Sequence, residues 1–207
     1  RMLQFITHCR GSHNEISGTR AVLEGGCRWV QLRMKDASES ELLSVGRTVG
    51  ELCRSFDAVF IVDDHVDLVE ALGADGVHLG KNDMPVAEAR KILGESKIIG
   101  ATANTVADMC AAAESGADYI GLGPFRFTTT KERLSPVLGI GGYREAMAAF
   151  REKSDLPVVA IGGITAADIP AIMATGVSGV ALSGTLLGAD DTTAETSKIL
   201  NLINTNK

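Results

Sequence analysis

Residues 123–131 carry the groups best suited to chemistry in this chain. They read Gly-Pro-Phe-Arg-Phe-Thr-Thr-Thr-Lys and directly follow an apolar run at 119–122, which is typical of a buried strand. Hydroxyl groups and an ammonium group gathered at the end of a strand can bind a phosphate through charge-assisted hydrogen bonds. Thr128, Thr130 and Lys131 are therefore the first candidates for a phosphate site.

Two other strand-like runs end in charged groups of opposite sign. One leads to Arg33 and Lys35, the other leads to Asp63 and Asp64, and Asp83 follows a third run. Mg²⁺ usually takes only one or two carboxylates and completes its shell with water and substrate phosphate. Cations together with paired acids therefore indicate a metal-bound polyphosphate. The alternative is that Asp63 and Asp83 cap the helices that follow them, as acidic residues often do.

The elements that must position these groups are eight short apolar runs, separated by longer segments of helical period. The runs span residues 3–6, 29–33, 59–63, 76–79, 97–101, 119–122, 157–161 and 179–182. The helical segments include residues 41–54, 86–93, 106–115, 143–151 and 166–175, with a closing helix at 192–202. Segments of this length can join parallel strands as crossover helices, so the pattern predicts a βα repeat.

Eight such units favour an α/β protein with one domain, residues 1–207, folded as a closed (β/α)₈ TIM barrel. Four helix-to-strand turns are similar in sequence, as expected of a repeated unit, and they begin at Gly25, Gly73, Gly116 and Gly176. The alternative is an open doubly wound sheet, which is disfavoured because no G-x-G-x-x-G follows the first strand.

A barrel places reacting groups at the carboxyl ends of its strands, where the βα loops form the only large concave surface. Side chains alternate along a strand, so Gln31, Arg33 and Lys35 share a face that points toward the barrel mouth. His78 also alternates inward and is a candidate hydrogen-bond donor, although a histidine beside apolar residues is as often structural. Thr102, after the fifth run, would line the mouth as a neutral donor.

Glycine-rich turns follow the seventh and eighth runs. Exposed backbone N–H groups around Gly163, Ser183 and Gly184 can cradle a phosphate, as recurs after the last two strands of such barrels. Tight turn geometry is the alternative for each glycine, and we favour phosphate binding for the two loops together. Further glycines within residues 134–142 suit a mobile lid over the bound substrates.

Charge and hydropathy limit the partners and the location. The net charge of −6 argues against a protein that coats nucleic acid. No apolar stretch approaches the roughly 20 residues needed to cross a bilayer, and the N-terminus lacks a basic segment followed by an apolar one. We expect a cytoplasmic protein whose partners are small phosphorylated molecules, with no nucleic acid and no membrane. We name a homodimer as its assembly, although no residue pattern supports one.

Taken in order, the motifs resemble those of the thiamine phosphate synthase family, also called thiamine-phosphate pyrophosphorylase, from residue 3 to about 187. The resemblance rests on Gln-Leu-Arg-x-Lys at 31–35, Asp-His-Val-Asp-Leu at 64–68, Gly-Val-His-Leu-Gly at 76–80 with Asp83, and Thr-x-Thr-Lys at 128–131. It implies a transferase of thiamine biosynthesis that uses Mg²⁺. Such an enzyme joins 4-amino-2-methyl-5-hydroxymethylpyrimidine diphosphate to hydroxyethylthiazole phosphate, giving thiamine phosphate and pyrophosphate.

The resemblance also implies roles for single residues. Arg33, Lys35 and Lys131 would be catalytic, because they neutralise the leaving diphosphate, and Asp64 and Asp83 would hold Mg²⁺. Contacts to the pyrimidine diphosphate would come from Gln31, Arg33, Lys35, Asp63, His78, Thr102 and Lys131. Contacts to the thiazole phosphate would come from Thr128, Thr130, Gly163, Ser183 and Gly184. The family is understood to react by dissociation, which needs no protein nucleophile.

Three positions depart from the family's usual pattern: Asp63, Thr102 and Asn104 stand where asparagine, serine and histidine are usual. A second carboxylate beside a diphosphate either repels it or recruits metal, so Asp63 is a candidate third ligand for Mg²⁺.

Two other functions stay open. A thiazole tautomerase of the same barrel superfamily needs neither diphosphate nor metal, and a non-catalytic binder of thiamine phosphates has less need for the metal acids.

Overall fold

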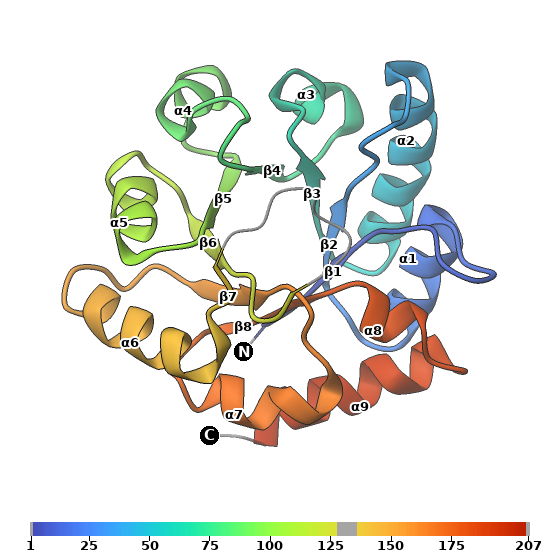
Figure 1. The fold of residues 1–207 in the computed structure, drawn as a ribbon. Helices are drawn as coiled ribbons and strands as arrows, with labels where there is room; N and C mark the ends of the chain where they lie inside the picture. The colour runs from blue at the N-terminus through green and yellow to red at the C-terminus, as the bar shows by residue number, and fades with distance from the viewer. Residues whose placement is uncertain (1, 128–135, 206–207) are drawn as a thin grey trace.

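Eight parallel strands form a closed barrel in the computed structural model, which describes residues 2–127 and 136–205 (Figure 1). The strands follow chain order around the barrel, and β8 pairs with β1. Their bounds are β1 (Met2–Ile6), β2 (Trp29–Leu32), β3 (Val59–Asp63), β4 (Gly76–Leu79), β5 (Ile98–Ala103), β6 (Tyr119–Leu122), β7 (Val158–Ile161) and β8 (Gly179–Leu182). The predicted (β/α)₈ barrel is confirmed, and the open sheet is excluded because the barrel closes.

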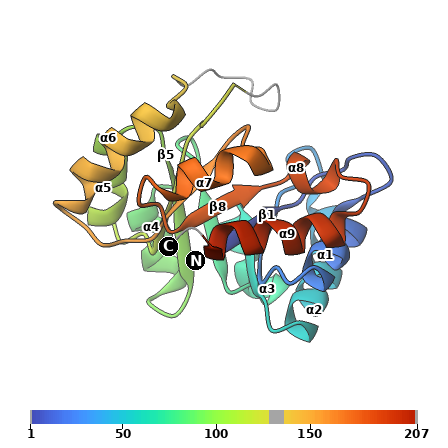
Figure 2. The ribbon, with the colours of Figure 1, turned by 90° about the horizontal axis from the view of Figure 1, so that it is seen from below.

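Helices surround the barrel and cover the outer faces of its strands (Figure 1). They are α1 (Glu15–Glu24), α2 (Glu39–Ser55), α3 (Val69–Leu72), α4 (Val86–Leu93), α5 (Val106–Glu114), α6 (Gly139–Arg151), α7 (Ile169–Met173), α8 (Gly184–Leu187) and α9 (Thr192–Thr205), with 3₁₀ turns η1 (Val66–Leu68) and η2 (Ala166–Asp168). The closing helix α9 lies against α1 and α8 (Figure 2). Among the described residues, no helix is both long and apolar enough to span a membrane.

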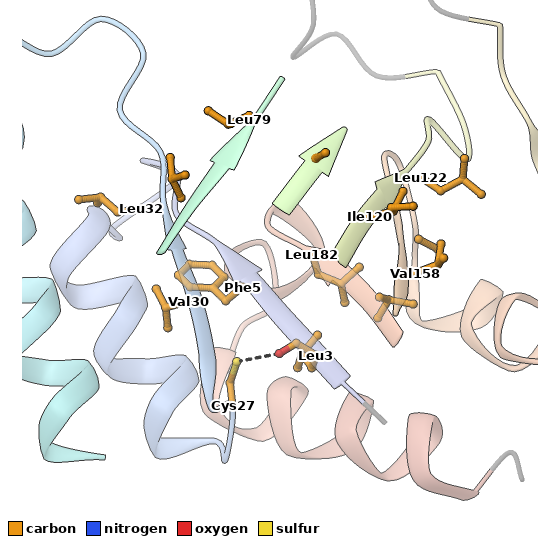
Figure 3. Packing of buried hydrophobic residues seen from close by; sticks show 14 of the residues in the cluster. Leu3, Phe5, Cys27, Val30, Leu32, Leu79, Ile120, Leu122, Val158 and Leu182 are labelled. Carbon is orange, nitrogen blue, oxygen red and sulfur yellow. Dashed lines mark hydrogen bonds between the residues drawn. The ribbon is translucent and has the colours of Figure 1, made fainter. Parts of the chain in front are cut away.

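The main hydrophobic core lies between the strands and the surrounding helices. Outward side chains such as Phe5, Val30 and Leu32 are fully buried in it (Figure 3). The intervening side chains form a second, smaller hydrophobic cluster around Tyr119, Val159 and Ala181, and they also include the buried polar residues Gln4 and Gln31. Alternation along the strands therefore leaves the polar set inside the barrel, where it leads up to the mouth.

The similar helix-to-strand turns hold the strands in register. Asp75 Oδ2 accepts a hydrogen bond from the Phe60 backbone N–H at 2.7 Å, and Asp118 Oδ2 accepts one from the Ile99 N–H at 2.7 Å. Ser178 makes the corresponding bond through its hydroxyl in the last of these turns. In three of the four similar turns, a side chain thus binds a backbone N–H near the start of the preceding strand.

The glycines of the predicted lid lie at the start of a helix in the part of the segment that the structure describes, and the motion of a lid stays a prediction. Gly141 and Gly142 lie in the first turn of α6, which begins at Gly139. The Leu138 N–H donates to the Pro124 carbonyl at 3.0 Å, and the Gly139 N–H donates to the Phe125 carbonyl at 3.1 Å. These bonds anchor the segment to the loop after β6, because backbone donors at a helix start must find acceptors. The remaining positions, 134 and 135, lie outside the described residues.

Candidate active site

Two cavities of about 890 and 870 Å³ adjoin at the carboxyl ends of the strands. Both are lined by Arg33, Asp63 and Thr102, where they meet. Lys35, Asp64 and Asp83 line the first cavity, and Gln31, His78, Gly163, Ser183 and Gly184 line the second. The structure therefore brings together all of the predicted site residues that it describes. Thr128, Thr130 and Lys131 lie outside the described residues.

The end of β2 is fixed so that Arg33 faces the cavities. The Arg33 N–H donates to Thr7 Oγ1 at 2.9 Å, and the Thr7 hydroxyl donates to the Arg33 carbonyl at 3.3 Å. Arg33 Nε lies 3.5 Å from Asp63 Oδ2, and each side chain is only 19% exposed. Since both side chains are largely shielded from water, the attraction between their charges is screened less than it would be on the surface.

The pKa of the Asp63 carboxyl is raised even though Arg33 lies beside it. Burial raises the pKa of its carboxyl to about 6; the Arg33 guanidinium lowers it, and the neighbouring Asp83 and Asp64 carboxylates raise it again. The three acids thus crowd negative charge at the ends of β3 and β4. Repulsion between these carboxylates destabilises their charged forms unless cations bind beside them.

This shift predicts that Asp63→Asn stabilises the protein in the absence of Mg²⁺. A pKa near 6 in the folded state, against about 3.9 unfolded, means that folding favours the protonated form, so Asp63 costs stability as pH rises through that window. We expect the variant to gain about 1–3 kcal/mol at pH 8 and about half of that at pH 5. Urea denaturation in EDTA measures both gains. An equal gain at the two pH values would exclude the raised pKa of Asp63 as its cause.

Asp64 and Asp83 do not cap helices, and neither does Asp63. The residues that precede η1 and α4, His65 and Pro85, make no capping side-chain hydrogen bond. Asp83 Oδ2 instead accepts from the Gly80 N–H at 2.5 Å, within its own loop. Asp64 has a φ of +68°, in the left-handed region, and its N–H donates to the His78 carbonyl at 2.8 Å. Backbone strain of this kind persists where surrounding structure enforces it, and it is often found at functional sites.

The Asp64 and Asp83 carboxyls fit a Mg²⁺ site. The pKa of Asp64 lies above its ordinary value, first because of burial and then because of the charge on the nearby Asp83 carboxylate. A divalent cation between two such carboxyls would remove their repulsion. Across residues 2–127 and 136–205, no group of three His, Cys, Asp or Glu side chains is placed to hold a metal ion. Asp63 pairs with Arg33 rather than joining the other two acids.

A buried polar network supports the floor of the second cavity. Gln4 Nε2 donates to the Tyr119 hydroxyl at 3.1 Å, and that hydroxyl lies 2.9 Å from His78 Nδ1. The other ring nitrogen, His78 Nε2, lies 3.0 Å from Thr102 Oγ1. The Tyr119 ring fits there because position 100 is glycine: a Cβ on Gly100 would clash with the ring. His78 therefore orients the Thr102 hydroxyl from beneath.

Sequence reasoning missed Gln4 and Tyr119, although both alternate inward on their strands. Tyr119→Phe removes the hydroxyl that joins Gln4 to His78, and the buried Gln4 Nε2 loses its hydrogen-bond acceptor. We expect a loss of about 1–3 kcal/mol in the free energy of unfolding, the usual cost of an unsatisfied buried donor. Chemical denaturation measures it. Unchanged stability would show that the network contributes nothing to the fold.

Two buried polar atoms of residues that line the second cavity, one on β2 and one in the loop after β8, have no partner among the described residues. Ser183 Oγ and Gln31 Nε2 are buried without a hydrogen-bond partner among the described residues, and both residues line the second cavity. Gly162 and Gly163 have φ values of +96° and +68°, so this turn favours glycine. Arg126 braces it by donating to the Gly163 carbonyl at 2.6 Å. Both unsatisfied atoms belong to residues that line the cavity, where they could hydrogen-bond to a polar ligand.

Comparisons with known proteins agree with this geometry. A family model described as thiamine monophosphate synthase matches residues 3–186. The chain is 57% identical to the thiamine-phosphate synthase of Phocaeicola vulgatus and 55% identical to that of Bacteroides fragilis, over 97% of this chain and 97% and 98% of those proteins. The solved structure of a thiamine phosphate pyrophosphorylase from Pyrococcus furiosus superposes with a TM-score of 0.88 at 36% identity, covering 99% of this chain and 96% of that one. The chain belongs to the thiamine monophosphate synthase family.

Proposed function

We propose that this protein is a thiamine-phosphate synthase. It condenses 4-amino-2-methyl-5-hydroxymethylpyrimidine diphosphate with hydroxyethylthiazole phosphate, and it releases pyrophosphate. The observation that carries the proposal is the division of the barrel mouth. A cavity lined by acids and cations adjoins a cavity lined by glycine turns and unsatisfied polar atoms, and the two meet at Arg33, Asp63 and Thr102. This division matches two phosphorylated substrates whose reacting ends must touch.

The first cavity suits the diphosphate of the pyrimidine substrate. Arg33 and Lys35 place positive charge beside the leaving group, and Lys131 adds a third cation in our assignment. Bound at Asp64 and Asp83, Mg²⁺ would neutralise diphosphate charge and so make it a better leaving group. Fixed charges in a site shielded from water stabilise a leaving anion because they need no reorganisation during the reaction.

The second cavity suits the thiazole phosphate. A thiazole bound there would have its ring nitrogen close to the methylene carbon of the pyrimidine. The bond between the methylene carbon and the diphosphate oxygen breaks, and the thiazole nitrogen supplies the electron pair for the new carbon–nitrogen bond. Gln31 and Thr102 are placed to orient the pyrimidine, and the protein supplies no nucleophile of its own. Its contribution is to hold the two substrates in contact and to exclude water from the methylene cation.

Product analysis tests this function against both alternatives. Purified protein is incubated with both substrates and Mg²⁺, and thiamine phosphate and pyrophosphate are quantified. Equal molar yields of the two products are expected. Isomerisation of the thiazole phosphate alone, without pyrophosphate release, would identify a tautomerase, and binding without turnover would identify a non-catalytic binder. The homodimer and the cytoplasmic location stay predictions, testable by sedimentation and by cell fractionation.

A further inference from the structure

Arg10, in the loop between β1 and α1, lines the second cavity on the side of β8. Its guanidinium lies directly against α8. A Cβ on Gly184 would lie 2.7 Å from Arg10 Nη1, and one on Gly188 would lie 3.2 Å from Arg10 Nε. Glycine at both positions therefore lets the guanidinium lie beside the turn that follows β8.

The loop that carries Arg10 is held in place by its own contacts. The backbones of Arg10 and His13 exchange two hydrogen bonds of 3.0 Å across a turn in which Gly11 has a φ of +60°. His13 Nε2 lies 3.3 Å from Thr192 Oγ1, and the same hydroxyl donates to the Leu186 carbonyl of α8 at 3.1 Å. The β1–α1 loop is thus docked onto α8 and α9, which orders the Arg10 backbone beside the cavity.

Arg10 is an exposed residue at the rim of the second cavity, and no acid among the described residues pairs with it. Arg33 pairs with Asp63, and the Glu195 carboxylate that lines the same cavity lies 3.0 Å from Lys198 Nζ. Among the described residues, the Arg10 guanidinium has no hydrogen-bond or ion-pair partner. Ser183 Oγ, next in the chain to Gly184, is buried and also unpaired within the described part of the chain. A cation and a hydroxyl without partners line the same end of the cavity.

We propose that Arg10 binds the phosphate group of the thiazole substrate, an inference that rests on the proposed function. The assigned thiazole phosphate contacts are hydroxyl groups and backbone N–H groups, all of them neutral. A phosphate monoester carries close to two negative charges at pH 7, and an arginine fork binds such a group through two parallel hydrogen bonds. Arg10 therefore determines the preference for the phosphorylated thiazole over its free alcohol.

Steady-state kinetics with each substrate varied separately test the inference. Arg10→Gln is expected to raise KM for thiazole phosphate about 10- to 100-fold, the usual effect of losing a hydrogen bond to a charged group. KM for the pyrimidine diphosphate should stay within about twofold, and kcat/KM for the unphosphorylated thiazole alcohol should not change. Arg10→Lys should recover part of the loss. Arg20→Gln, an exposed arginine of α1 outside both cavities, is the matched control.

Two results would overturn the assignment of Arg10. One is an unchanged KM for thiazole phosphate, and the other is an equal rise in KM for both substrates; thermal denaturation of the variant excludes a folding defect as the cause. If the unaltered protein forms no thiamine phosphate, the proposed function fails, and calorimetric titration with inorganic phosphate decides the inference separately. Weaker phosphate binding by Arg10→Gln would support it. Equal binding, or none by the unaltered protein, would overturn it.

Discussion

Arg33→Gln lowers kcat/KM for the pyrimidine diphosphate by about 10²- to 10⁴-fold, while the barrel stays folded. The size of the effect follows from the position of Arg33 where the two cavities meet, with only 19% of its side chain exposed. The variant removes the cation and also leaves the Asp63 carboxylate without its partner. The diphosphate therefore loses an attraction and meets a repulsion. Initial rates at varied pyrimidine diphosphate measure the effect.

A second substitution separates these two contributions. Arg33→Gln combined with Asp63→Asn removes the unpaired carboxylate, so the double variant should recover about 3- to 10-fold of the lost activity. Interaction between the two positions is expected because they are in direct contact. Arg47→Gln, on the exposed side of α2, is the control. A fall of less than about threefold in Arg33→Gln would show that Arg33 is not a diphosphate contact.

Asp64→Asn and Asp83→Asn are each expected to lower kcat by about 10²- to 10³-fold, with a large rise in the Mg²⁺ concentration needed for half-maximal rate. The two carboxyls line the same cavity and interact electrostatically, so they should act as a unit. The double variant should therefore be little worse than either single variant. Rates measured across a Mg²⁺ titration give both quantities.

Asp64→Asn and Asp83→Asn should lower activity but should not lower the stability of the fold. Because two adjacent carboxylates repel each other without metal, each single variant should be at least as stable as the unaltered protein in EDTA. Asp155→Asn, in the exposed loop before β7, is the control for loss of a surface charge. Full activity with an unchanged Mg²⁺ requirement in Asp64→Asn or Asp83→Asn would remove both residues from the metal site.

Local patterns in the sequence were sufficient to predict the barrel. Strand runs and helical period are properties of neighbouring residues, so the bounds of β3, β4, β6 and β8 agree with the predicted runs. Ser38 caps α2, and Glu41 completes a capping box, which is a pattern of residues close together in the sequence. The alternation of side chains along a strand also correctly predicted that Gln31 and Arg33 lie at the mouth, because every strand of a closed barrel has one inner face.

Contacts between residues far apart in the sequence could not be predicted from local patterns. The bond from Gln4 to Tyr119 joins residues 115 positions apart, and the Arg33–Asp63 pair depends on the register of β2 against β3. The sequence also did not show that the glycine-rich segment starts α6. Its backbone is hydrogen-bonded to the loop after β6, which is a contact that only the folded chain reveals. The roles of Thr128, Thr130 and Lys131 stay predictions from the family resemblance.

The most direct test of the proposed site is the initial rate of thiamine phosphate formation with Mg²⁺, with EDTA, and with EDTA followed by excess Mg²⁺. A site built on Asp64 and Asp83 predicts product with Mg²⁺, none above background with EDTA, and full recovery when Mg²⁺ is restored. Equal rates with Mg²⁺ and with EDTA would contradict a metal-bound diphosphate at the mouth of this barrel.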